Sequence, residues 1–217
     1  SKKVFPNLTK EEAEERMWET LFRLCRIDQP DPVQAWKDHV KVLMACSKYL
    51  NDKQYRSLHY KGPGTDFKIG LPRGHEWHAA QSECAIGFPF TANIPTEEVY
   101  TLPHCREAEG TVAASLPLNY NGVLIDGFQL RFEGGRVVNS SARVGDEVLK
   151  KLIATDEGSS RLGEVAIVPH SSPIAQSGIL FYNTLYDENA ASHFAFGQAY
   201  NTTLANGTSM TAEEFAE

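Results

Sequence analysis

The chain has 217 residues, of which 41% are hydrophobic and 23% charged, a composition typical of a globular protein large enough to bury a substantial core. Its formal net charge is −7 and no Lys/Arg cluster is present, which argues against nucleic acid and anionic membrane surfaces as partners. The sequence contains no run of about 18 apolar residues, so it predicts no membrane span.

The four cysteines are widely spaced along the chain. They are Cys25, Cys46, Cys84 and Cys105. A protein that depends on disulfides is normally short and dense in cysteine. We therefore expect reduced thiols and a cytoplasmic location.

The first 60 residues predict two amphipathic helices. Thr9 and Glu12 have the spacing of a capping box, in which a hydroxyl and a carboxylate satisfy backbone N–H groups at the start of a helix. A second helix is expected to begin at Pro32, because proline at the first helical position loses no hydrogen bond. Trp18 and Trp36 lie on the apolar faces of these helices, which we expect to pack against other structure.

Beyond Ser57 the pattern changes to short apolar runs separated by turn residues. Asp126-Gly127 lies between two such runs, at 123–125 and 128–132, and predicts a hairpin with a type I′ turn. A second turn is expected at Gly134-Gly135. Further strands are predicted near 111–116, 165–168, 179–182 and 193–196, and a further helix at 146–153.

The order of these elements predicts an α+β fold. We expect an N-terminal helical arm followed by a β-rich, mostly antiparallel domain, to which the resemblance described below adds metal binding. The boundary is predicted near residue 60, with residues 1–60 forming the helical segment and residues 61–217 the β-rich domain.

Short catalytic motifs are absent from the sequence. There is no glycine-rich phosphate loop, no GxSxG elbow and no HExxH pair. Glu98, Glu164 and His193 do adjoin apolar runs, where a carboxylate or imidazole is costly to bury unless it is paired or bound to metal. Each residue alone is more often an exposed or ion-paired side chain than a metal ligand. The residues themselves therefore indicate only a possible oxygen-and-imidazole metal site.

Six segments, in order along most of the chain, resemble the dinuclear metallo-aminopeptidases of the aminopeptidase T and aminopeptidase S type. These segments are 60–66, 93–101, 113–122, 162–166, 187–193 and 195–200. The resemblance implies four metal ligands, which are Glu98, Glu164, His193 and Tyr200. It leaves open whether Glu98 or Glu164 is the general base, and whether Tyr200 binds the metal or donates a hydrogen bond to the oxyanion.

The resemblance also implies an activity and its partners. An intact site would hold two divalent cations, zinc or cobalt being the expected metals, and would activate water to remove N-terminal residues from peptides with a free N-terminus. The family completes its site with a His-x-Asp pair, and no histidine follows His193 in this chain. It also has an N-terminal domain that we expect to be missing here. The resemblance thus implies a truncated form with weak metal binding and reduced or no activity.

Two alternatives remain beside this interpretation. The chain could be a metal-free structural or dimerisation fragment, because the apolar faces that carry Trp18 and Trp36 favour self-association as a homodimer. A different hydrolase could use other histidines instead, namely His78, His104 and His170.

Overall fold

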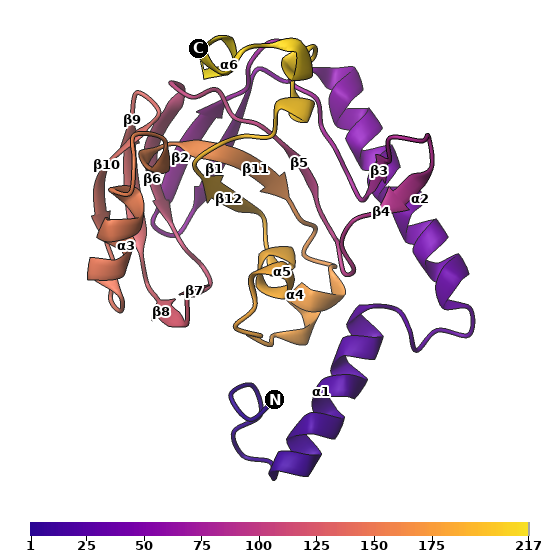
Figure 1. The fold of residues 1–217 in the computed structure, drawn as a ribbon. Coiled ribbons are helices and arrows are strands. Elements are labelled where there is room, and N and C mark those ends of the chain that lie inside the picture. The colour runs from indigo at the N-terminus through magenta and orange to yellow at the C-terminus, as the bar shows by residue number, and fades with distance from the viewer. Residues whose placement is uncertain (217) are drawn as a thin grey trace. The chain divides into compact units, whose positions relative to one another are not determined.

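A computed structural model describes residues 1–216 (Figure 1). The chain forms two compact units, each assembled from three separate segments. Unit 1 comprises Ser1–Ser47, Ala79–Val99 and Ile167–Ser192, and unit 2 comprises Lys48–His78, Tyr100–Ala166 and the residues from His193 onward. Among the residues described, no helix combines the length and apolar character needed to cross a membrane.

The two predicted N-terminal helices are confirmed as α1 (Lys10–Leu24) and α2 (Pro32–Lys53). The capping box at the start of α1 is formed in both directions. The Glu12 backbone N–H donates to Thr9 Oγ1 over 3.2 Å, and the Thr9 N–H donates to Glu12 Oε2 over 2.8 Å. At the start of α2, Asp31 Oδ1 accepts a hydrogen bond of 2.9 Å from the Gln34 backbone N–H.

The rest of unit 1 consists of short elements. They are the antiparallel pair β3 (Gln81–Glu83) and β4 (Pro89–Thr91), the helices α4 (Pro173–Ser177) and α5 (Thr184–Asp187), and the 3₁₀ turn η2 (Glu188–Ala190). The core of this unit is formed by Leu24, Ile174 and Phe181, with Met17 and Leu21 of α1 packed against them. The apolar residues predicted on one face of the first helix therefore pack against the core of unit 1.

The strand predicted at 179–182 is not formed. Tyr182 has a φ of +56°, which is incompatible with extended backbone. The backbone N–H of Phe181 donates to Asp187 Oδ1 over 2.7 Å instead of to a neighbouring strand. The apolar character that suggested a strand instead reflects burial of Phe181 in a loop.

Unit 2 contains a five-stranded sheet in which all neighbours are antiparallel, in the order β1-β2-β6-β9-β10. Its strands are β1 (Ser57–Gly62), β2 (Thr65–Gly70), β6 (Ala108–Ala113), β9 (Gln129–Glu133) and β10 (Arg136–Ser141). Phe67 and Phe132 are buried on one face with ring centroids 4.9 Å apart. The Phe194 ring lies 5.5 Å from that of Phe67, so the core extends to the segment that carries His193.

The hairpin predicted at Asp126-Gly127 is wrong. β8 (Val123–Ile125) pairs with β7 (Leu118–Tyr120), whereas β9 pairs with β6 and β10. The β7–β8 turn is Asn121-Gly122, where both residues have the positive φ that a type I′ turn requires. Asp126 exchanges backbone hydrogen bonds with Val144 instead. The turn predicted at Gly134-Gly135 is confirmed as the β9–β10 connection.

A second sheet of three strands has the order β12-β11-β5 (Figure 1). Its strands are β12 (His193–Phe196), β11 (Leu162–Ile167) and β5 (Val99–Thr101). The remaining elements are α3 (Asp146–Ile153), the 3₁₀ turns η1 (Gly158–Ser160), η3 (Asn201–Thr203) and η4 (Gly207–Ser209), and α6 (Ala212–Ala216). The predicted α+β class with mostly antiparallel sheets is confirmed, and the domain boundary near residue 60 stays a prediction.

Candidate metal centre

Strand alternation places Glu164 and His193 on the same face of the three-stranded sheet. In the antiparallel β11–β12 pair, Val165 lies opposite Phe194, and each of the two polar residues immediately flanks this apolar pair. Successive side chains on a strand point to opposite faces. Because Val165 is fully buried and Phe194 packs in the aromatic core, Glu164 and His193 project to the other face.

A bulge at Gly163 sets the position of Glu164. The β11–β12 register shifts between Leu162 and Glu164, so that an extra residue is inserted immediately before the carboxylate. A Cβ atom at Gly163 would overlap the carbonyl oxygen of Gly197 and lie 2.8 Å from the backbone of Gln198. Glycine is therefore required for the two backbones to approach this closely. Bulges of this kind redirect the next side chain on the strand.

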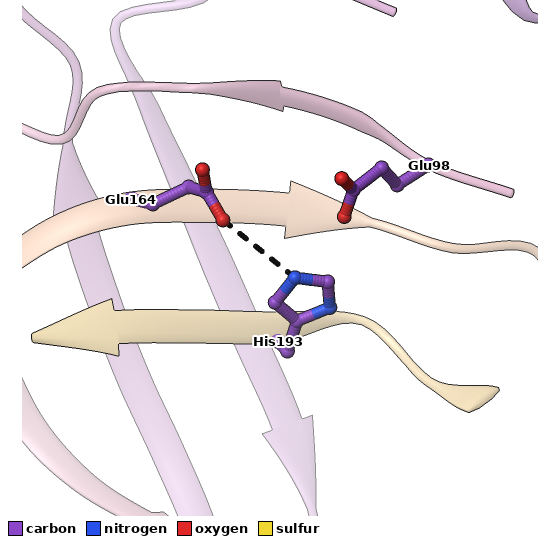
Figure 2. A group of neighbouring side chains, drawn as sticks. All are labelled: Glu98, Glu164 and His193. Carbon is purple, nitrogen blue, oxygen red and sulfur yellow. Dashed lines mark ion pairs between the residues drawn. The ribbon is translucent and has the colours of Figure 1, made fainter. Parts of the chain in front are cut away.

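The carboxylate of Glu164 faces the imidazole of His193 (Figure 2). Glu164 Oε1 lies 3.6 Å from His193 Nε2, and each side chain is 19% exposed. Both groups are thus largely withdrawn from water but remain accessible.

Glu98 completes a group of three. It immediately precedes β5, the strand next to β11 in the sheet order. One ligand atom from each of Glu98, Glu164 and His193 lies within 4.8 Å of the other two, and Figure 2 shows the three side chains converging. Within residues 1–216, no other histidine, cysteine, aspartate and glutamate side chains form a potential metal-binding group of three or more.

The chemistry of this group suits a divalent cation. Two carboxylate oxygens and one imidazole nitrogen form a donor set that zinc and similar metals accept. Two carboxylates with ligand atoms up to 4.8 Å apart also repel each other, by about 3 kcal/mol at an effective dielectric constant of about 20. A cation between them would convert this repulsion into attraction.

Tyr200 lies between β12 and η3, and its side chain is 65% exposed. Its ring centroid is 6.3 Å from that of Tyr100 on β5. The predicted fourth ligand therefore projects beside the β5 tyrosine at the surface of its unit. Its role as a ligand stays a prediction.

The alternative histidines do not form a cluster of their own. His78 Nε2 lies 3.8 Å from Glu76 Oε2, and His104 Nδ1 accepts a hydrogen bond of 3.2 Å from the Arg106 backbone N–H. None of His78, His104 and His170 belongs to a group of three potential ligands among the described residues. Within residues 1–216 these histidines therefore form no metal site of the kind seen at Glu98, Glu164 and His193.

Sequence reasoning missed one group of residues beside Glu98. The neighbouring carboxylate, Glu97, is 3% exposed and forms an ion pair of 2.6 Å with Arg26. A signal was present, because an acidic side chain two residues before the apolar start of β5 needs a partner if it is buried. The identity of that partner could not be read from the sequence, since Arg26 is distant in the chain.

Comparison with known proteins agrees with this geometry. The family model described as thermophilic metalloprotease (M29) matches residues 1–217. Aminopeptidase 2 of Geobacillus stearothermophilus is 51% identical over 214 residues, and aminopeptidase T of Thermus aquaticus is 51% identical over 215 residues. Each alignment covers 99% of this chain and 52% of the relative.

The fold of the chain is similar to that of a solved structure. The solved structure of wild-type AmpT from Thermus thermophilus superposes with a TM-score of 0.88 at 47% identity, covering 95% of this chain and 50% of that one. The chain thus spans about half the length of the relatives that it matches. On the strength of the match along its whole length, the chain belongs to the thermophilic metalloprotease (M29) family.

Proposed function

We propose that the protein is a metal-dependent aminopeptidase and that Glu98, Glu164 and His193 are ligands of its catalytic cation. The observation that carries the proposal is the convergence of these three side chains on one face of the β12-β11-β5 sheet. The relatives that match the chain are named aminopeptidases, and their family is one of metalloproteases. These facts support a hydrolytic role for the group.

Each residue of the group has a distinct contribution. Glu164 and His193 already face each other across neighbouring strands, so little reorganisation is needed for both to bind one ion. Glu98 adds the second carboxylate from the entry to β5. A divalent cation bound here, zinc or cobalt being the proposed metals and two ions the proposed number for an intact site, would polarise the scissile carbonyl and acidify an attacking water.

Proton transfer is assigned to one of the two glutamates. A carboxylate oxygen of Glu98 or Glu164 would take the proton of the attacking water and return it to the leaving amine. Tyr200 would supply a phenolic hydroxyl, either as a further ligand or as a hydrogen-bond donor to the oxyanion. Its exposed position beside Tyr100 supports a role in contact with substrate.

The proposal extends to substrate, location and assembly. Peptides with a free N-terminus are the proposed substrates, following the names of the relatives. A cytoplasmic location is supported by the cysteines, since no disulfide forms among the four within residues 1–216. A homodimer is supported by the exposure of Trp18 and Phe22 on α1, at 59% and 43%.

Hydrolysis of an amino-acid p-nitroanilide, measured with and without a chelator, tests the activity. Glu164→Gln should abolish turnover and weaken zinc binding by at least about 100-fold. Loss of a residue that only orients a ligand weakens metal binding by about 10–100-fold, and loss of the ligand itself should have a larger effect. Glu133→Gln is the matched control, since Glu133 lies in an exposed ion pair with Arg131. Unchanged zinc affinity in Glu164→Gln would exclude the ligand assignment. Zinc binding without turnover would favour a non-catalytic role.

A further inference from the structure

A buried ion pair lies directly beside the proposed ligand Glu98. Arg26 Nη1 lies 2.6 Å from Glu97 Oε1 and Arg26 Nη2 lies 3.1 Å from Glu97 Oε2, which is a two-pronged contact. The Glu97 side chain is 3% exposed and the Arg26 side chain 16%. Pairs of this geometry fix both the distance and the orientation of the carboxylate.

His39 of α2 contacts both Arg26 and Thr96, the residue that precedes Glu97. Its Nε2 lies 2.7 Å from the carbonyl oxygen of Thr96, and its Nδ1 lies 3.2 Å from Arg26 Nη2. A carbonyl oxygen can only accept and a guanidinium can only donate, so the imidazole donates through Nε2 and accepts through Nδ1. His39 is therefore neutral and holds the backbone at Thr96.

Asn189 holds the backbone of Glu97 from the other side. The Glu97 N–H donates to Asn189 Oδ1 over 2.7 Å, while Asn189 Nδ2 donates to the Leu185 carbonyl over 2.8 Å. Ser172 Oγ donates to the Asn189 carbonyl over 2.8 Å. Asn189 is 1% exposed and precedes His193 by four residues in the chain. The segment that leads to one proposed ligand is thus hydrogen-bonded to the segment that leads to another.

The backbone at Arg26 is itself unusual. Helix α1 ends in a Schellman arrangement, in which the Arg26 N–H donates to the Arg23 carbonyl and the Ile27 N–H donates to the Phe22 carbonyl. Arg26 occupies the left-handed position of this motif, with a φ of +58°. Glycine is the usual residue there, because a side chain disfavours the conformation. From this position the Arg26 side chain reaches the Glu97 carboxylate.

We propose that Arg26, Glu97 and His39 are positioning residues that hold Glu98 in the orientation needed to bind the metal. The inference rests on the proposed function, in which Glu98 is a ligand. Thr96 and Glu97 immediately precede Glu98, and side chains from α2 and the end of α1 hold both residues. With these residues fixed, the backbone from which the Glu98 side chain projects has little freedom to move.

Stability alone gives a weak reason for this arrangement. Removing two charges from water costs about as much as their attraction returns, so apolar residues of similar volume often serve a fold equally well. An apolar pair would not fix the direction of the Glu97 side chain in the way that two hydrogen bonds do. Orientation of the adjacent ligand is a property that the ion pair provides and an apolar contact does not.

The decisive experiment replaces both partners, so that no charge is left buried alone. The variants are Arg26→Met/Glu97→Met, Glu98→Gln, and the control Arg16→Met/Glu19→Met, which removes an exposed ion pair from α1. Zinc affinity is measured by titration calorimetry at a temperature where each variant is folded. The visible spectrum of the cobalt-loaded protein is recorded in parallel, because it reports on ligand geometry and not on folding stability.

We expect the Arg26/Glu97 double variant to bind zinc 10–100-fold more weakly, which is the effect typical of residues that orient metal ligands, and to alter the cobalt spectrum. The Arg16/Glu19 control should change neither. Unchanged zinc affinity and cobalt spectrum in the double variant, with a large loss in Glu98→Gln, would overturn the inference and leave the proposed function intact. Unchanged zinc affinity in Glu98→Gln would overturn the assignment of Glu98 as a ligand, on which both the proposed function and this inference rest.

A milder variant keeps the inference testable if the double variant does not fold. His39→Leu removes the hydrogen bonds to Thr96 and Arg26 and leaves the Arg26–Glu97 pair in place. We expect zinc affinity to fall several-fold and the cobalt spectrum to shift. Parental values for both in folded His39→Leu would overturn the inference.

Discussion

Glu164 Oε1 and His193 Nε2 lie 3.6 Å apart on adjacent antiparallel strands, with Glu98 near enough for all three ligand atoms to lie within 4.8 Å of one another. A site of this kind sacrifices stability in the metal-free protein, because like charges repel at this distance.

Glu164→Gln is therefore expected to stabilise the metal-free protein while weakening metal binding. The substitution removes the charge of Glu164 beside Glu98, with which it shares a group of ligand atoms that all lie within 4.8 Å of one another. We expect a gain of about 1 kcal/mol in the free energy of unfolding, after allowance for solvent screening. Urea denaturation in the presence of a chelator measures it. A loss of stability under these conditions would contradict repulsion as the dominant interaction.

Arg26→Met alone should destabilise the protein strongly. It leaves the Glu97 carboxylate buried without its partner, a change that costs roughly 3–5 kcal/mol in other proteins. Adding Glu97→Met should recover most of that loss. Denaturation of the single and double variants gives the coupling between the two residues. Arg16→Met, in an exposed pair, is the control and should cost less than about 1 kcal/mol.

His39 should make stability depend on pH near neutrality. Burial lowers the pKa of His39 below its ordinary 6.5, the Thr96 carbonyl and Glu97 oppose this shift, and Arg26 reinforces it. The unfolded chain then takes up a proton at higher pH than the folded protein does. The contribution of neutral His39 is full above about pH 6.5 and is lost as pH falls through the lowered pKa.

His39→Leu is accordingly expected to flatten the decline in unfolding free energy between pH 7.5 and pH 5. Denaturation curves at three or four pH values across this interval provide the measurement. His170→Gln is the control, because His170 is exposed. An equally steep decline in His39→Leu and in the parent would assign the pH dependence to other groups.

Gly163→Ala should damage both the fold and the site. The added methyl group would overlap the Gly197 carbonyl, so β12 must shift away from β11. We expect a loss of at least about 2 kcal/mol in stability and weaker zinc binding, since Glu164 follows directly on the bulge. Gly62→Ala is the control, because no heavy atom outside its chain neighbours lies within 4 Å of the added group. Equal stability of the two variants would exclude the close approach at Gly163.

Tyr200→Phe separates the two roles considered for the phenol. Because the side chain is 65% exposed, its hydroxyl should contribute less than about 0.5 kcal/mol to stability. A donor to the oxyanion predicts a fall in kcat of about 100-fold with zinc affinity unchanged, which is the outcome that we expect. A ligand would lower zinc affinity as well. The two measurements on one variant decide between them.

Local sequence signals predicted local structure well. The capping box at Thr9, the proline start of α2 and the helix at 146–153 are all present, because each depends on residues within one turn of helix. The hairpin at Asp126-Gly127 failed because a competing turn, Asn121-Gly122, lies a few residues upstream. Turn residues indicate where a chain reverses, but the choice between two such turns depends on long-range pairing.

In the candidate site, too, contacts between distant parts of the chain were not predictable from local sequence signals. The family resemblance predicted that Glu98, Glu164 and His193 belong to one site, and the structure brings the three together, whereas composition and spacing left them as isolated polar residues. The network around Glu97 was not predicted, since Arg26 and His39 reach it through contacts between distant parts of the chain. Neither hydrophobic periodicity nor a short sequence motif predicts contacts of this kind.

The order β12-β11-β5 has a consequence for the lifetime of the protein. The three proposed ligands are far apart in the chain, and only the assembled sheet brings them together. An ion that binds this group therefore binds the native state alone, and at 100 times its dissociation constant it would add about 2.7 kcal/mol to the free energy of unfolding. Metal supply would then govern turnover of the protein by cellular proteases, because the metal-free chain opens more often.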